Sequence, residues 1–333
     1  MRKTEHNRAK PDRLRYYTQD AHSAPHVDRE VRKNIRIFLG LEEGKTSFKY
    51  YRNLRDDIHS LTKGRCSYCG KYTELAIEHY RPKDGIATDT SKPRSISKPG
   101  YFWLASDWYN LHPACVPCNG LKTREILDSN TGKGVSKVVG KGNLFPLYGN
   151  KIHAPLLIQG NTKSSLSSST KKVNQEKPLL LNPSITLPSD LFNYEIVSNR
   201  RGSKLLICAK VDISPYKYAI AKTTIDILGL NSKDQAKDRM DTYTLTKEAL
   251  KNINSIASFD DIECMEQLAI LYSYIDDSEN GSYLGMIEWM FKDNLTLLAR
   301  QIDRHLVIPV RVYHSLNDIV QSIDRLFDQN NFQ

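Results

Sequence analysis

Two cysteine pairs of the form Cys-x-x-Cys are the clearest chemical feature of this sequence. The first pair is Cys66 and Cys69, and the second is Cys115 and Cys118. Each pair can bring two thiolates to one tetrahedral ion, and two pairs together complete a zinc site of four cysteines. Because four thiolates leave no open position for water, we expect this zinc to be structural. The alternative is a redox role, but no thioredoxin-like βαβ pattern surrounds the pairs.

A second group of polar residues lies between and beside the cysteine pairs. Glu78 and His79 follow the first pair, and Asn119 directly follows the second. The carboxylate of Glu78 and the amide oxygen of Asn119 are hard ligands that suit Mg2+ or Mn2+. His79, neutral near pH 7, can take a proton from an attacking water. These residues predict hydrolysis of a phosphodiester bond, in which the metal stabilises the departing 3′ oxygen.

Four further residues complete the predicted catalytic region. We expect Asn110 to brace the loop of a hairpin through its amide and so to orient His79. Arg81, Lys83 and Lys122 are candidate phosphate contacts. Alternatively, these three side chains only form part of the solvated surface. An acidic residue beside a histidine is by itself more often structural than catalytic. The prediction of a catalytic site therefore depends on the order of all these residues along the chain.

Particular elements are needed to position these side chains. A β-hairpin would present Glu78 and His79, and a helix that starts near Asn119 would turn its side chain toward them. Before the first cysteine, residues 46–63 carry apolar side chains at helical spacing. Residues 84–100 contain Asp, Thr, Ser, Pro and Gly, which is typical of an inserted loop.

The order of these residues resembles the HNH (ββα-metal) endonuclease motif in its zinc-stabilised form. Asn119 stands at the final ligand position in place of histidine, and Glu78 stands where aspartate is common; both keep an oxygen donor. Longer runs are similar to the PtuB-like nuclease subunits of Septu anti-phage systems, which are also found attached to retrons. These runs are IEHYRPK at 77–83, WLASDWYNL at 103–111, NLFPL at 143–147 and EKPLLLNP at 176–183.

The resemblance is specific over about 46–183. It implies a metal-dependent endonuclease that cuts DNA, and a partner that binds and restrains it, an ABC-type ATPase subunit (PtuA-like) in a hetero-oligomer. An RNase, for example one directed at tRNA, is an alternative, because attack of water on phosphate serves both substrates. A zinc-knuckle protein that only binds nucleic acid or its partner is a second alternative. Glu78, His79 and Asn119 argue against it, because binding alone requires none of them.

The charge is unevenly distributed along the chain. The formal net charge is +10, yet residues 1–200 hold 33 Lys and Arg against 19 Asp and Glu, whereas residues 201–333 hold 15 against 19. The first part can attract a phosphate backbone, and the acidic-leaning second part suits partner docking. No apolar run approaches the roughly 20 residues of a membrane span, and the N-terminus has no apolar signal core. We therefore expect a cytoplasmic protein without membrane contact.

We predict an α+β chain of four parts. Residues 1–45 form a basic N-terminal arm or helix, and residues 46–150 form a treble-clef-like HNH nuclease domain with the four-cysteine zinc site. Residues 151–190 form a flexible linker with a short strand at 179–181. Residues 191–333 form a mostly helical partner-docking domain, in which 191–207 alternate like a strand. Its helical segments are expected near 215–229, 233–253, 259–275, 281–305 and 314–328.

Overall fold

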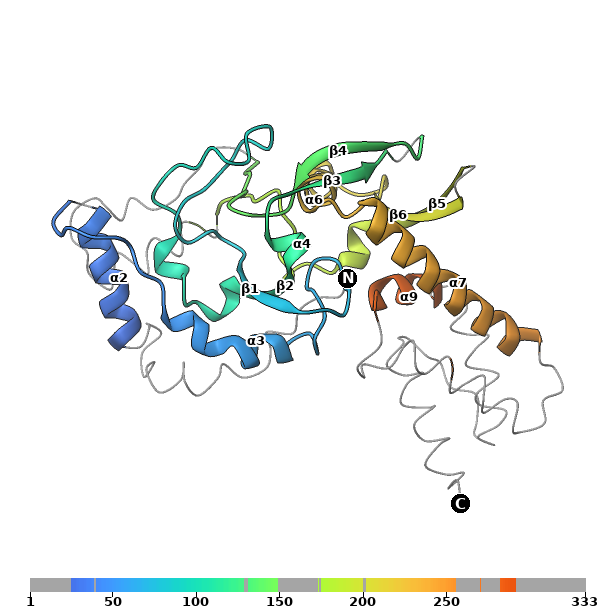
Figure 1. The fold of residues 1–333 in the computed structure, drawn as a ribbon, viewed down its shortest axis with the longest axis horizontal. Coiled ribbons are helices and arrows are strands. Elements are labelled where there is room, and N and C mark those ends of the chain that lie inside the picture. Colours follow the sequence, from blue (N-terminus) through green and yellow to red (C-terminus); the bar gives the residue numbers. More distant parts are fainter. Residues whose placement is uncertain are drawn as a thin grey trace, which may run out of the picture.

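The structure is a computed structural model. It describes residues 25–38, 40–128, 131–148, 173, 175–199, 202–255, 270 and 282–291. Within these ranges the chain is mixed α/β, with three two-stranded antiparallel sheets and helices around them (Figure 1). This agrees with the α+β prediction. Most of the basic arm, residues 151–172 of the expected linker, and the expected helix at 314–328 lie outside the described residues.

The cysteine pairs flank a hairpin and a short helix. Strand β1 (Leu75–His79) pairs antiparallel with β2 (Leu111–Cys115), and helix α4 (Val116–Asn119) follows β2 directly. Figure 1 shows these elements near the middle of the described fold, with α2 (Pro25–Phe38) at one end and α7 (Lys233–Ser255) at the other. The expected hairpin forms, but the helix ends at Asn119 instead of starting there. Its single turn stops because Gly120 adopts an extended conformation.

The segment before the first cysteine is less helical than expected. A short 3-10 helix, η1 (Tyr50–Leu54), leads into the helix α3 (Arg55–Ser60). Residues 46–49 are not helical, and the Thr46 hydroxyl donates to the Asp84 carboxylate at 3.1 Å. Helix α3 nevertheless buries its apolar face against the hairpin. This small core consists of Leu54, Ile58, Leu61, Trp108 and Leu111.

The long connection between β1 and β2 carries two more 3-10 helices. These are η2 (Phe102–Leu104) and η3 (Trp108–Asn110). The Asp107 side chain accepts a hydrogen bond from the Tyr109 backbone N–H at 3.0 Å and so caps η3. Residues 84–100 contain no helix or strand, in agreement with the expected loop.

Two more hairpins and three described helices complete the fold. The hairpins are β3 (Lys122–Leu127) with β4 (Gly134–Val139), and β5 (Phe192–Asn199) with β6 (Gly202–Ala209). The helices are α6 (Pro215–Leu228), α7 and α9 (Leu284–Phe291). The third part of the prediction was partly wrong, because 179–181 forms no strand and only Pro178 bridges to Leu147.

One hydrophobic core joins parts of the chain that we expected to be separate. It runs from Ile35 through the four cysteines to Leu230 and includes Leu180 and Leu181. These two leucines are almost fully buried, and burial of each contributes roughly 1.5–3 kcal/mol. Residues 175–190 are therefore packed and not a flexible linker. None of the helices in the described part of the chain combines the length and apolar character of a membrane span.

Candidate active site and zinc centre

The four paired cysteines converge on one point in the core. Their sulfur atoms all lie within 4.8 Å of one another, and the four residues are buried. Cys69 Sγ and Cys115 Sγ are 3.7 Å apart. A tetrahedral zinc site with Zn–S bonds of about 2.3 Å places its sulfurs about 3.8 Å apart. The donor set therefore fits zinc. Among the described residues it is the only group of three or more Cys, His, Asp or Glu able to share an ion.

The local fold explains why the sulfurs meet. Cys66 and Cys69 lie on a knuckle whose first turn is closed by the Gly70 N–H, which donates to Cys66 O at 2.8 Å. Ser67 N–H donates to Pro113 O at 2.9 Å and so fixes this knuckle to β2. The second pair lies at the end of β2 and on α4. A zinc ion would thus tie the knuckle, the hairpin and the helix together.

The cysteine cluster also favours ionisation of one thiol. Burial opposes the charged form of Cys66, but hydrogen bonds from the other three cysteines outweigh burial and hold its pKa well below the ordinary value. A thiolate is the form that binds a metal. Hydrogen bonds with Cys115, together with burial, hold the pKa of Cys69 and of Cys118 well above the ordinary value, so the cluster favours a single thiolate at Cys66.

His79 is held in one orientation at the end of β1. Its Nε2 lies 2.9 Å from the carbonyl oxygen of Ala105. Because a carbonyl oxygen only accepts, Nε2 carries the proton and Nδ1 keeps its lone pair. The Lys83 ammonium lies 3.4 Å from Nδ1. The ring of Tyr51 meets the imidazole edge to face, with 4.5 Å between the centroids.

The surroundings of His79 keep its imidazole neutral. Burial, followed by the positive charge of Lys83, lowers its pKa well below the ordinary value of 6.5. A neutral imidazole, whose Nδ1 lone pair here faces the Lys83 ammonium, is the form that can accept a proton. The imidazole is therefore neutral at pH 7 and fixed in one orientation.

Asn110 bridges the two ends of the connection that follows β1. Its Oδ1 accepts from Arg81 N–H at 2.7 Å, and its Nδ2 donates to Arg81 O at 3.1 Å and to Leu104 O at 3.0 Å. Leu104 precedes Ala105, whose carbonyl accepts from His79. Asn110 therefore braces the backbone next to Ala105, the residue whose carbonyl contacts the imidazole.

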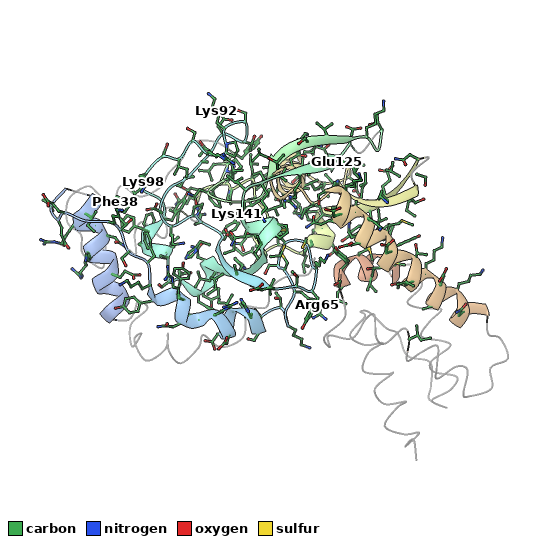
Figure 2. The ribbon with its side chains drawn as sticks, in the orientation of Figure 1. Phe38, Arg65, Lys92, Lys98, Glu125 and Lys141 are labelled. Carbon is green, nitrogen blue, oxygen red and sulfur yellow. The ribbon has the colours of Figure 1, made fainter. Side chains whose placement is uncertain are left out.

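Glu78 has a partner that we did not predict from the sequence. Its carboxylate pairs with the ammonium of Lys141, and the same ammonium donates to His79 O at 2.8 Å. Burial raises the pKa of the Glu78 carboxyl and lowers that of Lys141, while their mutual attraction opposes both shifts. Figure 2 shows Lys141 in the interior of the molecule, whereas Lys92 lies on an outlying loop. The glycines on both sides of Lys141 are the only local feature of the sequence that indicates a special position for this lysine.

The other expected metal ligand and the expected phosphate contacts differ in how far they are buried. Asn119 is half-buried at the end of α4, and this helix packs against β1, the strand that carries Glu78. Lys122 is exposed at the start of β3, and Lys83 is half-buried beside His79.

Arg81 differs from the expectation. Its buried guanidinium pairs with Glu176 and donates to Val173 O at 2.8 Å. It also lies over the rings of Tyr101 and Phe145, 5.0 and 5.1 Å from their centroids. The arginine therefore fastens Val173 and Glu176 to the core, and its guanidinium is not available to contact a phosphate.

The fold and its cysteine cluster define a mixed α/β protein with a centre suited to zinc. No protein-family model matches the chain. The chain is similar to the Septu protein PtuB of Bacillus mycoides (strain KBAB4), with 23% identity over 276 residues. The match covers 77% of this chain and 79% of the relative. This similarity supports the PtuB-like character that the sequence motifs suggested.

Proposed function

We propose that this protein is a metal-dependent HNH-type endonuclease that hydrolyses phosphodiester bonds in DNA. The observation that carries the proposal is the fixed imidazole of His79, with Nε2 bonded to Ala105 O and Nδ1 facing the Lys83 ammonium. It stands next to Glu78 on a hairpin whose end is joined to the four-cysteine cluster. A protein that only bound nucleic acid would need no such base.

In this proposal each residue of the site has a distinct task. His79 Nδ1 accepts the proton of the attacking water, and Asn110 keeps the imidazole in place through the backbone of residues 104–105. Glu78 and Asn119 hold Mg2+, which supplies contact to a phosphate oxygen and stabilises the departing 3′ oxygen. Lys83 and Lys122 are the candidate contacts to the phosphate backbone.

We further propose a biological setting. The relative bears the name Septu protein PtuB, which fits an effector nuclease of an anti-phage system. In that setting an ABC-type ATPase subunit (PtuA-like) binds and restrains the nuclease. Residues 201–333 hold 15 Lys and Arg against 19 Asp and Glu, so they are a poor surface for nucleic acid and suit the docking of that partner.

Purified protein with its zinc retained tests the activity and the choice of substrate. Supercoiled plasmid and tRNA are incubated with the wild type, with and without Mg2+, and with Asn119→Ala. The matched control is Asn193→Ala, which removes an exposed asparagine on β5. We expect plasmid cleavage that requires Mg2+ and Asn119 but not Asn193.

The other outcomes discriminate between the remaining functions. Cleavage of tRNA alone would make the protein an RNase, with the same site residues. If the chain cleaves neither substrate alone, the assay is repeated with the ATPase subunit present. Continued absence of cleavage there would contradict an endonuclease and favour a zinc-knuckle binding protein.

A further inference from the structure

A buried lysine stands directly against the proposed metal ligand. The side chains of Lys141 and Glu78 are 1% and 5% exposed, and they form an ion pair. The Lys141 ammonium also donates to His79 O at 2.8 Å. One cation therefore contacts the proposed metal ligand and the backbone of the proposed base.

The backbone around Lys141 is built to keep it there. Lys141 N–H donates to Cys118 O at 2.8 Å, and Gly142 N–H donates to Asn119 O at 2.7 Å. A Cβ atom on Gly140 would overlap the carbonyl oxygen of Gly120, and Gly142 has a φ of +48°. Only glycines allow this segment to lie so closely along the end of α4. The lysine between them is consequently fixed beside the hairpin.

This arrangement changes the charge that an incoming cation meets. A buried carboxylate without a counter-ion is costly, and Lys141 removes that cost before any metal arrives. A divalent cation bound to Glu78 would have to share the carboxylate with an ammonium and would be repelled by it, strongly so in a buried site. A carboxylate that an ammonium already neutralises is a weak ligand for Mg2+.

We propose that Lys141 is a resident counter-ion of Glu78, which positions the carboxylate and keeps the affinity of the site for a divalent cation low. This inference rests on the proposed metal-dependent nuclease. It implies that the cation binds well only when phosphate oxygens of the nucleic acid add to the donor set, as is usual for Mg2+ in phosphate chemistry.

Mn2+ binding to the zinc-loaded protein tests this role without any cleavage assay. The affinity is measured from the relaxation of water protons for the wild type and for Lys141→Gln, whose amide can still donate a hydrogen bond. Lys141→Met is a second variant without a polar group. We expect both variants to bind Mn2+ at least about tenfold more tightly, because the repulsive charge is gone. The matched control, Lys137→Met on the exposed face of β4, should bind like the wild type.

Each remaining outcome has a defined meaning. Unchanged or weaker Mn2+ binding in a folded Lys141 variant would overturn the proposal. So would loss of zinc and of helical circular dichroism in both variants, since Lys141 would then be a structural residue only. The variant Glu78→Gln distinguishes a failure of the Lys141 proposal from a failure of the proposed metal site. If no tested form shows Mn2+ binding that depends on Glu78, the proposed metal site fails as well.

Discussion

The imidazole of His79 and the side-chain amide of Asn110 are anchored to neighbouring carbonyl groups of one turn. His79 Nε2 lies 2.9 Å from Ala105 O, and Asn110 Nδ2 donates to Leu104 O at 3.0 Å. The orientation of the proposed base thus depends on a residue that lies 31 positions further along the chain. Both side chains are buried, so water does not compete for these bonds.

Asn110→Asp should reduce cleavage while leaving the fold largely in place. The carboxylate keeps the acceptor for Arg81 N–H but loses both donated hydrogen bonds. Loss of a residue that orients a catalytic histidine should lower kcat about 10- to 100-fold with little change in KM. Steady-state kinetics on plasmid or on a short duplex measure this split. An unchanged kcat would show that the hydrogen bonds donated by Asn110 are not needed to orient His79.

The pH dependence of cleavage should reflect the lowered pKa of His79. Because the neutral imidazole is the active form, the rate is full above the pKa of the folded protein and falls as the pH drops through it. Burial and the Lys83 charge place that fall below 6.5. Lys83→Gln removes the charge, so the acidic limb should move to higher pH. A pH–rate profile checks this, with exposed Lys92→Gln as the control; equal shifts in both variants would contradict the local effect.

Loss of one zinc ligand should unfold the hairpin region. Cys118→Ser removes one of four thiolates, and zinc binding to such sites contributes about 10 kcal/mol or more to folding. We expect less than stoichiometric zinc by metal analysis, a lower melting temperature and no cleavage. Cys208→Ser, outside the cluster, should retain zinc and stability. Full zinc and an unchanged melting temperature in Cys118→Ser would refute a structural zinc centre.

The buried pair of Arg81 and Glu176 should be important for stability. Arg81→Met leaves the fully buried Glu176 side chain without its cation. Breaking a buried ion pair from one side costs about 3–5 kcal/mol. Chemical denaturation should show this loss, whereas Arg94→Met in the exposed loop should change stability little. A loss no larger than that of the control would restore Arg81 as a candidate surface contact.

The sequence predicted what depends on local spacing. Each Cys-x-x-Cys loop is short enough to bring its own two thiolates together, and the expected hairpin that carries Glu78 and His79 forms. The β-like alternation near 191–207 likewise corresponds to the β5–β6 hairpin. The adjacent Asn119 was placed correctly beside the second pair, although on the wrong end of its helix.

What the sequence did not predict depends on contacts between distant residues. Lys141 meets His79 across 62 positions, and Arg81 meets Glu176 across 95. No periodicity or motif predicts these contacts, because Lys141, Arg81 and Glu176 look like ordinary surface charges in the sequence. Leu180 and Leu181 were assigned to a linker for the same reason, since the core that buries them is assembled from the rest of the chain.

The most direct test of the central claim is single-turnover cleavage of supercoiled plasmid by the wild type and His79→Ala, at equal zinc content and with Mg2+. His59→Ala is the matched control, because this half-buried histidine lies on α3 and has no role in the proposed chemistry. The account predicts that His79→Ala loses at least about a hundredfold in rate, typical of a missing general base, while His59→Ala cleaves like the wild type. Equal cleavage by the wild type and His79→Ala would contradict His79 as the base.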